Sequence, residues 1–159
     1  MLKRGDQAPD FSLLDQDARR HSLAELTASG PFILYFYPAD FTPGCTREAC
    51  DFRDLHGKIA GAGLTVVGVS PQSPESHRRF RDRYGLPFTL LSDEDKSVIR
   101  AYGVDGPLGI GVRRATFLIG PDGRIEDAVL ADFRIARHQE FVARVVAARE
   151  DRVGSPRRG

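Results

Sequence analysis

The sequence predicts an α/β fold in which a central mixed β-sheet is covered by helices on both faces. Apolar runs of strand length alternate with segments of helical periodicity, two late runs form a hairpin around a turn, and an amphipathic helix ends the pattern. The 159 residues, 41% of them hydrophobic, are enough for one domain with a real core. We expect that domain to span residues 1–150 and residues 151–159 to be a flexible basic tail.

The first predicted elements are short. Phe11–Leu14 is expected to be extended, and Asp15–Asp17 has the composition of a turn. Ser22 and Glu25 form a capping-box pattern, which predicts the start of a short helix.

A strand-helix-strand unit follows. The aromatic run Phe32–Tyr37 predicts a buried strand that Pro38 ends, and Leu64–Val69 predicts a second one. Between them, Cys45–Ala60 is predicted to be a helix ended by Gly61–Gly63, with a right-handed crossover. Its apolar residues lie three or four positions apart, as on one buried face: Ala49, Phe52, Leu55 or His56, and Ile59.

The third predicted helix begins at Ser73 and ends at Gly85. Phe88–Leu91 is a possible strand, and Ser92 or Asp93 is expected to cap the next helix.

The remaining elements complete the sheet. The glycine-rich stretch 103–111 predicts an extended loop to which the sequence assigns no function. Ala115–Ile119 and Arg124–Leu130 predict a hairpin around Pro121–Gly123, and Ala136–Ala148 predicts the last helix. This order of elements matches a thioredoxin-like sandwich.

Composition and charge exclude several classes of function. A net charge of +1 gives no field that would recruit nucleic acid or an anionic membrane. There is no charged-then-apolar leader and no apolar run near 18 residues, so neither export nor a membrane span is expected. With only two cysteines, we expect a reducing, cytoplasmic setting and a transient, catalytic disulfide.

Cys45 lies at or just before the first turn of a predicted helix. The free N–H groups and the positive dipole end of a helix favour an anion, and a thiolate is such an anion. The alternative is that Cys45 is a small buried hydrophobic residue, although proline, glycine and threonine surround it. Arg47 is close in sequence, but an arginine there is usually solvated.

Cys50 follows five residues later. On an intact helix, this spacing separates the two Cα atoms by ~8.6 Å. A disulfide needs less than about 7 Å. If the two cysteines pair within one chain, the first turns of the helix must therefore unwind.

The motif Pro38-x-x-x-Thr42-x-x-Cys45 resembles the active-site motif of peroxiredoxins. A second cysteine at Cys50 is similar to the Q-type subfamily, also called bacterioferritin comigratory protein. The resemblance covers residues 3 to 150 and includes further segments: Gly5–Phe11, Leu90–Asp93, Ala101–Val104, Arg114–Ile119 and Asp132–Phe133.

The resemblance implies a thioredoxin-like fold and a peroxidase for hydrogen peroxide and organic hydroperoxides. Cys45 would be oxidised to a sulfenic acid, Cys50 would resolve it as an intramolecular disulfide, and thioredoxin or a similar dithiol protein would reduce that disulfide. No metal, haem or flavin cofactor is expected. The chain is expected to be a monomer or a weak homodimer.

Other residues receive roles beside the cysteines. Thr42 offers a hydroxyl to thiolate and peroxide, with a helix N-cap as the alternative, and Pro38 would shield Cys45. The resemblance selects Arg114 as the residue that reaches the thiolate, and strand alternation turns Arg113 to the other face. For Glu48, orienting an arginine competes with plain surface solvation.

Two other classes of function remain as alternatives. A copper-delivery protein of this fold would use cysteines and a histidine, but the four histidines, at positions 21, 56, 77 and 138, form no ligand cluster with the cysteines. A redox-regulated holdase would use peroxide as a signal. Copper titration and continuous turnover with a reductant separate these alternatives from a peroxidase.

Overall fold

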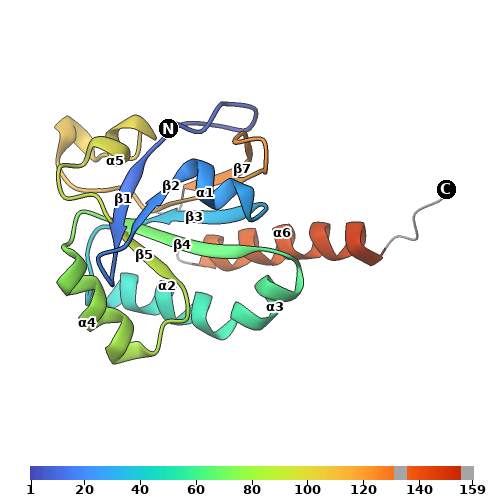
Figure 1. Cartoon of the computed structure of the whole chain (residues 1–159), viewed down its shortest axis with the longest axis horizontal. Helices are drawn as coiled ribbons and strands as arrows, with labels where there is room; N and C mark the ends of the chain where they lie inside the picture. Colours follow the sequence, from blue (N-terminus) through green and yellow to red (C-terminus); the bar gives the residue numbers. More distant parts are fainter. Residues whose placement is uncertain (131–135, 155–159) are drawn as a thin grey trace.

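The aromatic run at residues 32–36 forms strand β3 (Phe32–Phe36), in which every side chain is buried. It pairs in parallel with β4 (Thr65–Ser70) and antiparallel with β6 (Ala115–Ile119), so it lies inside the sheet. In this computed structural model, which describes residues 1–130 and 136–154, seven strands form one mixed sheet in the order β2-β1-β5-β4-β3-β6-β7 (Figure 1). The other strands are β1 (Ser12–Asp15), β2 (Arg20–Ser22), β5 (Thr89–Ser92) and β7 (Ile125–Leu130).

Helices cover both faces of this sheet, as the sequence predicts (Figure 1). They are α1 (Leu23–Ala28), α2 (Pro43–Asp54), α3 (His56–Gly61), α4 (Pro74–Tyr84), α5 (Ser97–Ala101) and α6 (Ala136–Gly154), with a 3₁₀ turn at Pro107–Gly109.

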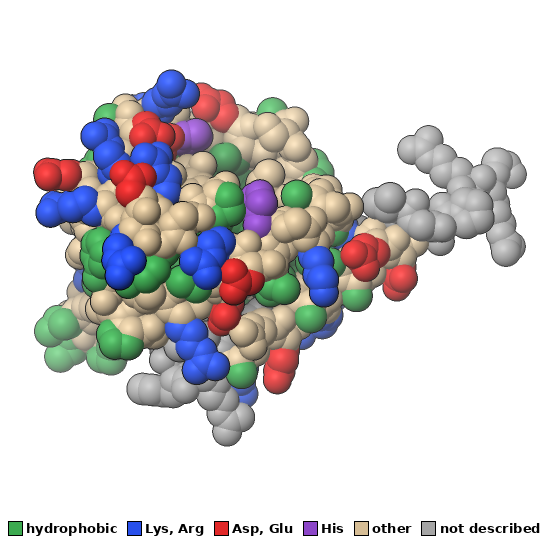
Figure 2. Space-filling model, turned by 90° about the horizontal axis from the view of Figure 1, so that it is seen from below, with side chains coloured by type: hydrophobic (Ala, Val, Ile, Leu, Met, Phe, Trp, Pro, Cys, Tyr) green, Lys and Arg blue, Asp and Glu red, His purple; other side chains and the backbone are tan. Residues whose placement is uncertain are grey.

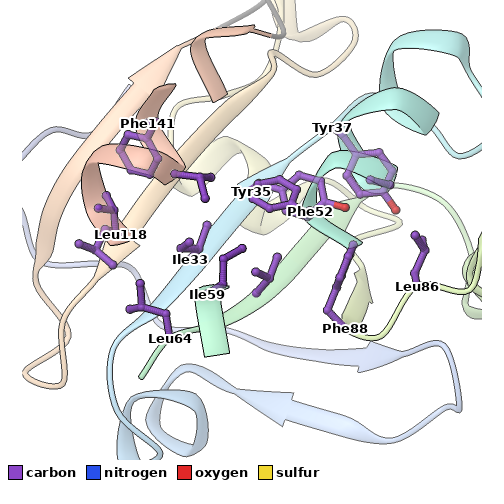
Figure 3. Close-up of a cluster of buried hydrophobic side chains, with 14 of the residues drawn as sticks. Ile33, Tyr35, Tyr37, Phe52, Ile59, Leu64, Leu86, Phe88, Leu118 and Phe141 are labelled. Carbon is purple, nitrogen blue, oxygen red and sulfur yellow. The ribbon is translucent and has the colours of Figure 1, made fainter. Parts of the chain in front are cut away.

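The alternation of side chains along β3 creates two hydrophobic clusters, one on each face. Ile33 and Tyr35 point into the cluster covered by α2, α3, α4 and α6, which Figure 3 shows. Phe32, Leu34 and Phe36 point into the cluster covered by α1 and α5. On the outer surface of α2, α3, α4 and α6, basic and acidic side chains are interspersed (Figure 2), in keeping with the net charge of +1.

The helix predicted at Cys45–Ala60 is two helices. It begins at Pro43, because a proline has no N–H to leave unpaired and has the φ of a first helical residue. It is interrupted at Leu55, whose φ of −90° and ψ of −1° depart from the α-helix and tighten the last turn. The predicted buried face is confirmed for Ala49, Phe52 and Ile59.

Two other parts of the fold differ from the prediction. Strand β2 was not predicted, because Arg20–Ser22 is polar and is held by pairing with β1 rather than by burial. The helix expected after Ser92 or Asp93 begins later, with Lys96 as its N-cap, because a turn follows Asp93 first; Ser92 belongs to β5. The Asp93 carboxylate still accepts a hydrogen bond from the N–H of Ile99 at 2.7 Å.

The last helix continues to Gly154, beyond the predicted end at Ala148 and into the segment expected to be a tail. Residues 155–159 and the Asp132–Phe133 motif lie outside the described residues. The predicted inward positions of this helix are confirmed as buried: Phe141, Val142, Val145 and Val146. Among the described residues, no helix is long and apolar enough to cross a membrane.

Candidate active site

Cys45 lies in the first turn of α2, at the carboxyl end of β3. Thr42 occupies the N-cap position and Pro43 follows it, so the backbone N–H groups of the helix start surround the cysteine. The side chain is 1% exposed. The sequence predicted this position, and the burial agrees with the alternative that Cys45 is partly a core residue.

Arg114 distinguishes Cys45 from an ordinary buried cysteine. Its Nη2 lies 3.3 Å from the sulfur of Cys45, and its Nη1 forms a 2.9 Å ion pair with Glu48. Burial opposes the positive charge, but Glu48 and Cys45 outweigh that effect, so the pKa of Arg114 is raised. The guanidinium is therefore a permanent cation held against the sulfur.

The register of β6 explains why Arg114 reaches the cysteine. Leu118 packs in the same cluster as Cys45, whereas Ala115 and Phe117 pack on the opposite face. Arg114 has the same parity as Leu118 and precedes a strand that pairs with β3. The predicted alternation is confirmed for Arg114.

Glu48 is a buried partner of the arginine, and the expectation of surface solvation was wrong. It is 1% exposed and lies three residues after Cys45 on the same helix face as Ala49 and Phe52. The helical periodicity could have indicated its burial, because that face is the apolar one.

Thr42 occupies the N-cap position but does not cap the helix with its side chain. Its hydroxyl donates a 3.0 Å hydrogen bond to the carbonyl oxygen of Ala39 and so closes the loop before α2. The N-cap hydrogen bond, which was the alternative role for Thr42, is therefore absent from the described part of the chain.

Pro38 is half-buried and lines a cavity of about 650 Å³ together with Arg113 and Arg114. The glycine-rich loop, to which the sequence assigned no function, forms the opposite wall through residues 105–112. Arg114 thus borders this cavity and also contacts the sulfur of Cys45.

Cys50 is half-buried, five residues after Cys45 on the same continuous helix. The two cysteines are not joined by a disulfide in this structure. In the described residues, no group of three or more histidine, cysteine, aspartate or glutamate side chains could hold a metal ion; the side chain at position 138 lies outside that description.

This sheet, with a buried cysteine at a helix start and an arginine fixed against its sulfur, defines a thiol-dependent redox enzyme. The chain belongs to the AhpC/TSA family, whose model matches residues 4–128.

Curated relatives support a more specific assignment. The chain is 42% identical over 147 residues to peroxiredoxin Bcp of Escherichia coli, covering 89% of this chain and 93% of that protein. It is 46% identical over 140 residues to a putative peroxiredoxin of Mycobacterium tuberculosis, covering 84% of this chain and 87% of that protein.

Solved structures agree with the sequence relatives. Peroxidoxin BcpB from Mycobacterium tuberculosis superposes with a TM-score of 0.86 at 36% identity, over 93% of this chain and 98% of that chain. Peroxiredoxin Q from Xanthomonas campestris gives 0.80 at 33% identity, over 87% of this chain and 91% of that one. The predicted thioredoxin-like fold and peroxiredoxin resemblance are confirmed, and the protein is a thiol-dependent peroxidase.

Proposed function

We propose that Cys45 is the peroxidatic residue, that Cys50 resolves it, and that the substrates are hydrogen peroxide and organic hydroperoxides. The observation that carries the proposal is the 3.3 Å contact between Arg114 and the sulfur of Cys45. A cation there stabilises the thiolate and the negative charge that develops on the departing oxygen. A bacterioferritin comigratory protein of Xanthomonas campestris has been studied for alkyl peroxide reduction, which supports the wider substrate range.

The chemistry has two oxidative steps. The Cys45 thiolate attacks one peroxide oxygen, the O–O bond breaks, and the departing oxygen takes a proton to leave as water or an alcohol. The Cys50 thiolate then attacks the sulfur of the Cys45 sulfenic acid, the S–S bond forms as the S–O bond breaks, and the departing hydroxide takes a proton from solvent to leave as water. Thioredoxin or a related dithiol protein returns two electrons by thiol–disulfide exchange.

Pro38 and Thr42 shape the surroundings of this reaction. Pro38 shields Cys45 from bulk water, and Thr42 holds the loop and offers its hydroxyl oxygen to the peroxide. Because Cys45, Cys50 and Arg114 all come from one chain, the site requires no second copy, which supports a monomer or weak homodimer. A dithiol that must be regenerated suits a reducing compartment, which supports the cytoplasm.

The test is peroxide-dependent NADPH oxidation coupled through thioredoxin and its reductase. Wild-type protein should turn over continuously, and Cys45→Ser should lose more than 99% of that rate while folding normally, because a hydroxyl is far less ionised than a thiol. Residual turnover within tenfold of wild type would refute the assignment of Cys45. A single equivalent of peroxide consumed without turnover in the wild type would favour a redox-regulated holdase.

A further inference from the structure

A second buried contact between titratable side chains, Asp40 and His77, lies beside the loop that leads into α2. Asp40 and His77 are both fully buried, and Nδ1 of His77 lies 2.7 Å from Oδ2 of Asp40. Tyr37 donates a 2.7 Å hydrogen bond to Oδ1 of the same carboxylate, and Ser76 donates one of 2.8 Å to Oδ2. The Asp40 carboxyl group therefore connects the end of β3, through Tyr37, to α4, through Ser76 and His77.

The hydrogen-bond geometry fixes where the protons are. Nε2 of His77 lies 3.0 Å from the carbonyl oxygen of Leu91, which can only accept, so Nε2 carries a hydrogen. At 2.7 Å, the contact between Nδ1 and Oδ2 of Asp40 is a hydrogen bond, so these two atoms share one proton. Burial raises the pKa of Tyr37 well above its usual value, which keeps its hydroxyl a neutral donor. Both side chains are fully buried, so the network is shielded from water.

The loop that this network holds is strained. Phe41 has a φ of 65°, in the left-handed region that side chains other than glycine rarely adopt. Its ring packs edge-to-face on Phe80 of α4, with 5.2 Å between the ring centroids. Strain of this kind persists only where the surroundings over-determine the backbone. Asp40 and Phe41 together attach the loop to α4.

We propose that Asp40 and His77 are positioning residues for the oxidation of Cys45. Asp40 lies two residues from both Pro38 and Thr42, and the proposal rests on the function proposed for that site. The buried pair fixes the loop so that these two residues face the Cys45 sulfur while a peroxide is attacked. Misplacing such a loop by about 1 Å can cost about a hundredfold in rate.

The test compares His77→Leu with His21→Leu. His21 also lies 2.7 Å from an aspartate, Asp15, but on the β1–β2 hairpin at the far side of the sheet from Cys45. Peroxide oxidation of Cys45 is followed by stopped flow, and alkylation of the reduced thiol by iodoacetamide gives a second rate. Both are measured below the melting temperature of each variant.

We expect His77→Leu to slow peroxide oxidation at least tenfold while alkylation changes less than threefold, because alkylation needs the thiolate but not the oriented loop. His21→Leu should leave both rates within twofold of wild type. Equal losses in the two rates for His77→Leu would show a merely structural role and overturn the proposal.

The double variant Asp40→Ala/His77→Leu covers the case in which the single variant does not fold. It removes both partners of the buried contact, so neither is left without the other, and much of the thermal stability should return. The peroxide rate should stay at least tenfold below wild type, and recovery to within twofold would overturn the proposal. Failure of the proposed function is distinct, because wild-type Cys45 would then not be oxidised by peroxide at all.

Discussion

At the scale of single residues, the Arg114 guanidinium is shared between the Cys45 sulfur and the Glu48 carboxyl group, and Glu48 sets its direction. The ion pair with Glu48 is the shorter contact, at 2.9 Å, and it leaves Nη2 aimed at the sulfur of Cys45. Because the guanidinium is planar and makes two contacts, its orientation is fixed, whereas a lysine ammonium could rotate about its single nitrogen. The orientation of the Arg114 guanidinium therefore depends on a carboxylate on the same helix as Cys45, the proposed nucleophile.

Arg114→Ala should slow both the alkylation and the peroxide oxidation of Cys45 by more than tenfold, because the thiolate loses its cation. It should also lower the free energy of unfolding by about 3 kcal/mol, since Glu48 is left as a buried charge without this partner. Arg113→Ala is the matched control and should change both rates less than threefold. The rates are measured by stopped flow and iodoacetamide labelling. Equal effects, or a larger one at Arg113, would mean that the proposed roles of the two arginines are wrong.

The sequence could predict the residues whose spacing is local. Thr42, Cys45 and Cys50 lie within one motif, and Arg114 follows from resemblance and strand parity. Asp40 and His77 could not be predicted, because 37 positions separate them and their contact exists only once α4 packs beside the loop. Burial of both groups is a property of that packing and has no local signature.

At the scale of elements, the strands and helices that bury an apolar face could be predicted from the sequence. The elements that were missed depend on backbone pairing or backbone conformation and have no apolar pattern. Strand β2 has no apolar pattern. The break between α2 and α3 at Leu55 has no proline or glycine at that position, so no local signal in the sequence indicates it. The sequence does predict that an intact α2 and a Cys45–Cys50 disulfide are incompatible. Cys45 and Cys50 lie on one continuous helix, where the ideal Cα separation of ~8.6 Å exceeds the bonding limit of about 7 Å.

Oxidation should therefore open the start of α2. We expect amides of residues 45–52 to lose protection from hydrogen exchange when the Cys45–Cys50 disulfide forms, and helical circular dichroism to fall. Cys50→Ser is the control: after one equivalent of peroxide it should hold a sulfenic acid at Cys45 and keep the protection of the reduced form. If mass spectrometry finds the disulfide while those amides stay protected, bond formation and helix opening are not coupled.

At the scale of the whole molecule, α2 is also part of the larger hydrophobic cluster. Phe52 is 2% exposed and packs on Tyr35, with 4.6 Å between ring centroids, and on Phe88 (Figure 3). The same cluster includes Phe141 of α6. Opening the helix would therefore disturb a hydrophobic cluster that α2 shares with α6, although the two helices are far apart in the sequence.

The net effect of oxidation on stability depends on two opposing contributions. Closing a loop as short as Cys45–Cys50 stabilises the fold by about 2 kcal/mol through the unfolded state. Exposing Phe52 costs about 1.5–3 kcal/mol, and disturbing the buried Arg114–Glu48 pair adds about 3 kcal/mol or more. The losses exceed the gain, so the oxidised protein should be less stable.

For a chain of this length, a net loss of about 2.5–4 kcal/mol lowers the melting temperature by roughly 5–16 °C. Thermal denaturation followed by circular dichroism, with and without one equivalent of peroxide, measures the shift. Cys50→Ser treated in the same way should melt within about 2 °C of its own reduced form, because its helix stays closed, and it should over-oxidise when peroxide is in excess. An oxidised wild-type protein that carries the disulfide and melts at or above the temperature of the reduced form would show that the packing of Phe52 survives the opening of α2.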